Sequence, residues 1–322
     1  MAKKTKIKFP SELRLDLISR DWVVIATGRG RRPEMFKKEK RSGQEAAKKD
    51  CPFCRLEKKR VFVVPNKYPA FLPSKTLGKK VEGGIYQTMN AVGFCELVVT
   101  RDHKKSLALL PQGDVEEVIG VYQERYLELM EKPHVNYVSI FHNHGAEAGA
   151  SQPHPHSQII TTPLVDADLK NALLNSEKYF RENKKCVYCQ MIEWEKAIKR
   201  RIIFENEDFL AICPFASKAA FEIIVSPKNH LPYFERINEK EKKQLAEALR
   251  ISLRKLYKGV GDPAYNFYLH TAPCDGKDYS YYHWHWTILP KTATWAGFEL
   301  GAKMEISAIA PEKAAEYLKK QK

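Results

Sequence analysis

The sequence predicts an α+β fold that is present twice in tandem, and three observations lead to this prediction. The first is an internal repeat: each half contains a Cys-x-x-Cys pair, then an apolar segment that ends in a single histidine, then a His-x-His segment. The second is a nearly constant offset between the copies, from 135 residues at the first cysteines to 127 at the lone histidines. The third is that apolar, β-branched runs alternate with long amphipathic segments in both halves. Each half is therefore expected to form an antiparallel sheet with flanking helices.

The individual elements can be placed along the chain. Strands are expected at residues 97–100, 138–141, 222–225 and 284–289, and helices at 114–131, 166–183 and 239–258. A further pair of strands, 137–143 and 265–271, repeats with His142 and His270 both in sixth place. The change to a polar helical pattern after Thr162 predicts an N-terminal domain over 1–165 and a C-terminal domain over 166–322.

Composition limits the classes of function. The 322 residues are enough for about two domains, and a net charge of +15 is spread over Lys-rich stretches without interleaved aromatic residues. This pattern argues against a nucleic-acid partner, although a positive field would help to bind a phosphorylated substrate. Neither a run of about 20 apolar residues nor a secretory signal is present, so no membrane association and a cytoplasmic location are expected.

The seven cysteines are an odd number, which argues against a disulfide framework and leaves the two Cys-x-x-Cys pairs as candidate metal ligands. Two thiolates on one tight turn need two more ligands from elsewhere in the chain, and each half offers two histidines at corresponding places. Two Cys with two His is a closed tetrahedral set typical of structural Zn²⁺. The sequence therefore predicts two zinc ions per chain, one bound by Cys51, Cys54, His103 and His154, the other by Cys186, Cys189, His230 and His283.

A candidate chemical centre follows the first metal set. Residues 154–160 alternate like a strand, which would place His154, His156 and Gln158 on one face. With His154 bound to metal, His156 would keep a free imidazole nitrogen and could act as a nucleophile near pH 7. Gln158 could donate a hydrogen bond to a phosphoryl oxygen but cannot be a general acid. That favours a leaving group needing little protonation, such as a sugar phosphate, whose second pKa is about 6.

Together, Gly-x-Ser-x-Pro, His-x-His-x-Gln, the duplication and the Cys-x-x-Cys pair resemble the galactose-1-phosphate uridylyltransferase branch of the histidine-triad superfamily. The resemblance runs from Leu15 to about Pro311. It implies that His156 attacks the α-phosphorus of UDP-glucose, that a hexose 1-phosphate accepts the nucleotide in a ping-pong cycle, and that the enzyme is a homodimer with its active site near the subunit boundary. The residues expected to bind substrate are Arg29, Arg32, Asn66, Asn143, Ser151, Gln158, Phe298 and Glu299.

Two departures from the family pattern leave alternatives open. The second Cys-x-x-Cys pair stands where better-known members resemble an iron site, and twin pairs also occur in relatives that look like ADP-glucose phosphorylases. The segment 294–299 keeps a Gly-aromatic-Glu ending without the Lys-Phe start. An ADP-glucose or dinucleoside-polyphosphate phosphorylase using the same histidine is therefore the alternative, and a zinc-containing nucleic-acid module is a third hypothesis. In the second half His285 takes the place of His156 without a following Gln, which predicts a degenerate copy with His270 beside it.

Overall fold

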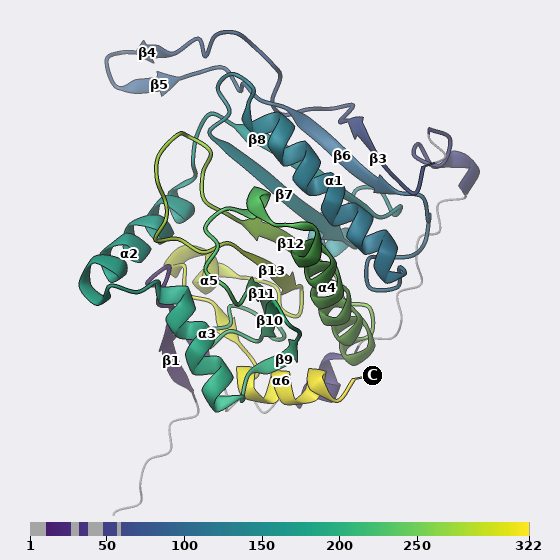
Figure 1. Ribbon diagram of the computed structural model, residues 1–322, viewed down its shortest axis with the longest axis vertical. Helices are drawn as coiled ribbons and strands as arrows, with labels where there is room; N and C mark the ends of the chain where they lie inside the picture. The colour runs from purple at the N-terminus through teal and green to yellow at the C-terminus, as the bar shows by residue number, and fades with distance from the viewer. Residues whose placement is uncertain (1–10, 27–31, 38–47, 57–58, 322) are drawn as a thin grey trace, which may run out of the picture.

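The computed structural model describes residues 11–26, 32–37, 48–56 and 59–321. Its centre is a nine-stranded antiparallel sheet in the order β3-β6-β8-β7-β12-β13-β11-β10-β9 (Figure 1). The strands of the first half are β3 (Val61–Pro65), β6 (Cys95–Thr100), β7 (Tyr137–His144) and β8 (His156–Thr162). Those of the second half are β9 (Ile202–Glu205), β10 (Phe209–Ile212), β11 (Ile223–Pro227), β12 (Tyr265–His270) and β13 (His285–Pro290).

The α+β, antiparallel and duplicated architecture is confirmed. The order β3-β6-β8-β7 in the first half matches β10-β11-β13-β12 in the second, and the two copies join where β7 pairs with β12. The two predicted sheets are thus one continuous sheet, because the outermost strand of the first copy, β7, pairs with the outermost strand of the second, β12. Pairing these edges removes two rows of exposed backbone hydrogen-bonding groups.

Two long helices, α1 (Gln112–Met130) and α4 (Glu239–Val260), cover one face of the sheet and pack against each other (Figure 1). Helix α4 begins at a capping box formed by Asn238 and Glu241, and it ends at Gly261, whose φ of +79° suits a residue without a side chain. Tyr122 and Tyr126 of α1 are fully buried against the sheet. This face is called the core face below.

The opposite face of the sheet, called the site face below, carries three of the residues predicted to be functional: His156 and Gln158 of β8 and Asn143 of β7. Over the second half it is covered by α2 (Ala167–Asn183), α3 (Val187–Ile198) and the segment 15–21. The remaining elements are β1 (Glu12–Leu15), β2 (Trp22–Ile25), β4 (Lys80–Glu82), β5 (Tyr86–Thr88), β14 (Ile306–Ser307), α5 (Gly297–Ala302), α6 (Pro311–Lys319) and the short 3-10 turns η2 (Pro33–Phe36), η3 (Lys48–Asp50), η4 (Ala146–Ala148) and η5 (Phe234–Arg236). Within the described ranges no helix is long and apolar enough to span a membrane.

Two expectations from the sequence need correction. Strand β8 begins at His156, so His154 lies just before the strand, where its ring reaches toward the Cys-x-x-Cys turn. The predicted match of His142 with His270 is also wrong by one position. His142 pairs with Ser157 and faces the core, whereas His270 pairs with His285 on the site face. Because His156 corresponds to His285, the residue of β7 that corresponds to His270 is Asn143. A shift of one residue in a strand exchanges the faces.

Candidate active site and metal centres

The first predicted metal set converges in the structure. One ligand atom from each of Cys51, Cys54, His103 and His154 lies within 4.8 Å of all the others. The Nδ1 atom of His154 is 3.4 Å from Cys51 Sγ, 3.6 Å from Cys54 Sγ and 3.2 Å from His103 Nδ1. Its other ring nitrogen, Nε2, donates a hydrogen bond to the Thr100 carbonyl at 2.6 Å. That bond fixes the tautomer and leaves Nδ1 as the ligand.

The second set converges in the same way. Cys186, Cys189, His230 and His283 also bring one ligand atom each within 4.8 Å of the others. His230 Nε2 donates to the Ser280 carbonyl at 2.6 Å, and His283 Nε2 donates to the Pro227 carbonyl at 2.9 Å. Both rings therefore turn Nδ1 toward the cysteines, as in the first set.

Both groups have the dimensions that a tetrahedral zinc site requires. Bonds of about 2.3 Å to sulfur and about 2.0 Å to nitrogen place neighbouring S and N ligand atoms roughly 3.6 Å apart and two N atoms roughly 3.3 Å apart. The observed separations in the first group, 3.2 to 3.6 Å, agree with this geometry. Each half can hold one metal ion with a closed set of four ligands.

The backbone next to the first metal group orients His156. Its Nδ1 donates to the His154 carbonyl at 2.9 Å, so Nε2 carries the lone pair. Phe53, inside the Cys-x-x-Cys turn, contacts both rings, with centroids 5.5 Å from His154 and 5.3 Å from His156, so the two rings lie on the same side of the backbone. Burial lowers the pKa of His156, opposed by the bond to the His154 carbonyl. Burial therefore favours the neutral imidazole, and Nε2 makes no hydrogen bond to any described residue.

Amide side chains share the site face with His156. Gln158 follows two positions along β8 and lies opposite Phe141 of β7. Asn143 comes two positions after Phe141, which places it beside His156, and its Oδ1 accepts a hydrogen bond from Asn266 Nδ2 at 2.8 Å. The chain then turns through Gly145 and Gly149, with φ of +83° and +86°, conformations that favour glycine. This arrangement offers neutral donors beside the imidazole and backbone that can approach an anion closely.

The other predicted substrate residues are more widely spread. Ser151 is exposed on the loop that precedes His154. Asn66 follows β3, with its N–H bonded to the Cys95 carbonyl at 2.9 Å. Arg32 is exposed, and the turn η2 that follows it packs on α4 and α6 of the second half. Arg29 lies outside the described residues.

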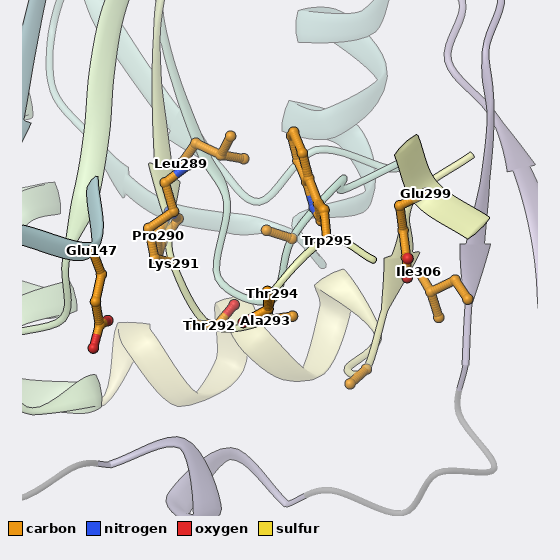
Figure 2. A pocket seen from close by; sticks show the side chains of 12 residues that line it. Glu147, Leu289, Pro290, Lys291, Thr292, Ala293, Thr294, Trp295, Glu299 and Ile306 are labelled. Atoms are coloured by element: carbon orange, nitrogen blue, oxygen red, sulfur yellow. The ribbon is translucent and has the colours of Figure 1, made fainter. Parts of the chain in front are cut away.

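Glu299 lines a separate cavity of about 760 Å³ near the C-terminal end of β13, and Phe298, its neighbour in α5, is exposed. Figure 2 shows Trp295 and Glu299 on one side of this cavity and Glu147 on the other. His156 does not line it. Leu289, which does, lies three strands from His156 along one row of the sheet, a separation of roughly 14 Å. Within a single chain, the cavity that holds Glu299 therefore lies on the site face of the sheet but apart from His156.

Two family models match the chain and together cover most of it. The model for "Galactose-1-phosphate uridyl transferase, N-terminal domain" matches residues 2–166, and the model for its C-terminal domain matches residues 173–321. The chain belongs to the galactose-1-phosphate uridylyltransferase family.

Relatives within and around this family carry two different names. An ADP-glucose phosphorylase of Arabidopsis thaliana is 29% identical, with 96% of this chain and 92% of the relative aligned. A galactose-1-phosphate uridylyltransferase of Thermotoga maritima is 28% identical, with 96% and 98% aligned. Among solved structures, the Arabidopsis ADP-glucose phosphorylase with bound ADP-glucose has a TM-score of 0.79 at 26% identity over 96% of this chain and 99% of the other. A uridylyltransferase structure has 0.77 at 28% identity over 95% and 97%.

The second half retains the histidine pair of the uridylyltransferase fold in altered surroundings. His285 Nδ1 points at the His283 carbonyl at 3.4 Å, and Tyr188 contacts both rings as Phe53 does in the first half. The rings of His270 and His285 stack with their centroids 4.8 Å apart, and His270 stands at the position that Asn143 has in the first half. His270 is not part of the second metal group. Thr287 stands in the place of Gln158, since it follows His285 by two positions. The amides that flank His156 are therefore replaced at this copy.

Two parts of the site were not anticipated from the sequence. One is the aromatic residue that packs on the histidine pair; its signal was present, because both Cys-x-x-Cys turns have an aromatic residue in third place, Phe53 and Tyr188. The other is a buried polar cluster behind β8, in which Ser157 Oγ is bonded to Tyr122 and to His142. No sequence pattern predicts this cluster, because its three residues come from three separate elements, α1, β7 and β8.

Proposed function

We propose that the protein is a UDP-glucose–hexose-1-phosphate uridylyltransferase that carries the nucleoside monophosphate on His156. The observation that carries this proposal is the hydrogen bond from His156 Nδ1 to the His154 carbonyl, which leaves an unprotonated Nε2 on the site face. A neutral imidazole with a fixed lone pair is the form that attacks phosphorus. Proximity of the neutral amides Gln158 and Asn143 supports a phosphoryl rather than an acyl substrate.

The proposed reaction has two displacements. In the first, Nε2 forms a bond to the α-phosphorus of UDP-glucose, and the bond to the bridging oxygen breaks, so glucose 1-phosphate leaves with the electron pair. In the second, a phosphate oxygen of the acceptor hexose 1-phosphate attacks the same phosphorus and His156 leaves. Neither leaving group needs a general acid. A sugar phosphate is largely ionised near pH 7, and His156 keeps its proton on Nδ1 throughout, so it leaves the phosphorus as a neutral imidazole.

The residues proposed to bind substrate divide by position. Gln158, Asn143 and Ser151 would hold the α-phosphoryl oxygens beside the nucleophile. The remaining candidates, which lie apart from His156 or outside the described part of the chain, would bind the sugar phosphate and nucleotide: Arg29, Arg32, Asn66, Phe298 and Glu299.

We also propose a homodimer with the active site at the subunit boundary. Residues that lie far from His156 of their own chain would then contribute to the active site of the second copy. Arg32 and Phe298 are both exposed near the second half, as an intersubunit role requires. We further propose that both metal ions are zinc, that the repeat units are residues 1–165 and 166–322, and that the enzyme is cytoplasmic, without a nucleic-acid or membrane partner.

A second candidate is an ADP-glucose phosphorylase that uses the same histidine, with inorganic phosphate as the acceptor. The observation that favours it is the similarity, at 29% identity, to the Arabidopsis enzyme of that name. Either activity would pass through a nucleotidyl-His156, so the base and the acceptor distinguish them.

The test is to incubate the protein with UDP-glucose or ADP-glucose, each labelled at the α-phosphorus, and to measure protein-bound label after gel filtration. The uridylyltransferase proposal predicts label from UDP-glucose, chased into UDP-galactose by galactose 1-phosphate. Label from ADP-glucose alone, chased by inorganic phosphate, would establish the second candidate instead. Absence of label from both donors would rule out the covalent step.

A further inference from the structure

A buried polar cluster lies on the core face, directly behind the strand that carries His156. Ser157, the next residue after His156, bonds through Oγ to His142 Nδ1 of β7 at 3.0 Å and to Tyr122 Oη of α1. His142 and Ser157 are 1% and 3% exposed, and Tyr122 is fully buried. The cluster thus joins three elements at one hydroxyl: α1, β7 and β8.

Counting donors fixes the direction of these bonds. If Tyr122 donates to Ser157, and Ser157 donates to His142 Nδ1, one polar group remains without a partner, the N–H at His142 Nε2. The reverse direction would leave both Nε2 and the Tyr122 proton unpaired. His142 Nε2 is indeed buried without a hydrogen-bond partner among the described residues. Because each unpaired buried group costs about 1–3 kcal/mol, the first direction is favoured.

The other copy of the repeat shows that the fold does not require this cluster. Since His156 corresponds to His285 and Asn143 to His270, Ser157 corresponds to Trp286 and His142 to Leu269. Those residues are hydrophobic, fully or almost fully buried, and cross-strand partners in the same register, and their one polar atom, Trp286 Nε1, has no hydrogen-bond partner among the described residues. An apolar pair at these positions is ordinarily as stable as a polar one or more so. The polar version is present in the half that holds the candidate nucleophile.

We propose that His142, acting through Ser157 and Tyr122, is a positioning residue that fixes His156 and Asn143 relative to one phosphoryl group. Ser157 lies between His156 and Gln158 in β8, and His142 immediately precedes Asn143 in β7. A hydrogen bond between these two core-face side chains therefore sets the spacing of the site-face side chains next to them. This inference rests on the proposed function, because it assigns the cluster a role in nucleotidyl transfer.

The surroundings of His142 support a fixed, neutral ring. It packs between aromatic side chains of β12, with centroids 5.6 Å from Phe267 and 6.2 Å from Tyr265. Burial, followed by the nearby His144 and His156, lowers the pKa of His142 well below its ordinary value. Burial thus favours the neutral ring, whose Nδ1 can accept the hydrogen bond from Ser157.

The test measures the single-turnover rate of protein labelling from the α-labelled nucleotide sugar that labels the wild type. His142→Leu copies the residue of the second half and removes the acceptor, whereas His142→Asn keeps an acceptor oxygen near the position of Nδ1. We expect His142→Leu to label roughly ten- to hundredfold more slowly, since small misplacements of reacting groups have effects of this size. The nucleotide-sugar concentration at half-saturation and the melting temperature should change little, and His142→Asn should recover most of the rate.

Ser157→Ala provides an independent arm if His142→Leu fails to fold. It deletes one oxygen atom and should slow labelling to the same extent, and the double variant should be no slower than either single one. Wild-type rates in Ser157→Ala or His142→Leu, or equal slowing in His142→Asn and His142→Leu, would overturn the positioning role. If the wild type itself takes no label from either donor, it is the proposed function that fails.

Discussion

At the scale of single residues, the difference between the two copies lies in what surrounds an imidazole that both retain. His156 and His285 each turn Nδ1 toward the carbonyl of the histidine two positions earlier. His156 has Asn143 and Gln158 beside it, which can donate hydrogen bonds to phosphoryl oxygens. His285 has the ring of His270 stacked on it and Thr287 in place of the glutamine. The two copies therefore differ in the hydrogen-bond donors that stand beside the imidazole, not in the orientation of its Nδ1.

Replacing His156 with Asn tests the nucleophile directly. Asn is polar and small enough for the site but cannot form a stable nucleotidyl intermediate, so we predict a loss of turnover of about 10³-fold or more. Protein-bound label should disappear, while metal content and melting temperature stay near the wild-type values because His156 is not a metal ligand. His285→Asn is the matched control and should keep both label and turnover. Label retained by His156→Asn would place the covalent step elsewhere.

At the scale of elements, each metal group joins a Cys-x-x-Cys turn to the segment before a strand. In the first half that strand is β8, and Phe53 in the turn packs on both histidine rings. In the second half the strand is β13, and the turn lies at the start of α3. The first ligand group therefore lies beside the strand that carries the candidate nucleophile, and the second lies where α3 meets the sheet.

Removing one ligand from each group should distinguish the roles of the two groups. Cys51→Ser is expected to reduce bound zinc from about two to about one per chain and to abolish labelling, since His154 would no longer be held. Cys186→Ser should lose the same amount of zinc and lower the melting temperature, yet retain a measurable labelling rate in the folded fraction. Metal analysis beside the labelling assay provides the measurement. Equal loss of labelling per folded molecule in both variants would contradict the separate roles.

The elements also show what a single sequence can reveal. Repeated spacing predicted both metal groups and the candidate nucleophile, because ligand chemistry constrains residue type at each position. The same repeat misplaced His142 by one residue, since both strands contain a histidine and only the pairing register tells which face it occupies. The strand predicted from His154 begins two residues later, because the His154 ring is held between the Thr100 carbonyl and the Cys-x-x-Cys turn. The pairing of β7 with β12, which joins the two sheets, could not be predicted, because a local sequence pattern does not show which strand edges will pair.

At the scale of the whole molecule, the β7–β12 pairing makes the repeats one body. The hydrophobic core beneath α1 and α4 extends across both halves. Within it, the ring centroids of Tyr122 in the first half and Trp286 in the second are 5.8 Å apart. Stability is therefore shared, and a charge change in one half affects the folding of both. Two ionisable groups of the second half are placed where their effects on stability oppose each other.

The first of these groups is Glu222, whose pKa is raised to about 7 by burial, opposed by hydrogen bonding and charge from Lys218. The second is His270, whose pKa is lowered to about 4, again chiefly by burial. As pH falls from 7 toward 4.5, folded Glu222 takes up a proton before the unfolded chain does, so the cost of burying its carboxylate is relieved and the unfolding free energy rises. Below pH 6.5 the unfolded chain protonates first at His270, so the unfolding free energy falls. Each slope is at most about 1.4 kcal/mol per pH unit.

Substitution of either group should therefore change the acid response in opposite directions. Between pH 6.5 and 5, the unfolding free energy of Glu222→Gln should fall more steeply with decreasing pH than that of the wild type, by up to about 1.4 kcal/mol per unit. That of His270→Asn should fall less steeply, since the proton-binding difference at residue 270 has been removed. Urea unfolding with zinc present at each pH measures the slopes. His142, whose pKa is also lowered, is present in all three proteins and therefore does not contribute to the difference between them. Parallel slopes would mean that neither group changes its pKa on folding.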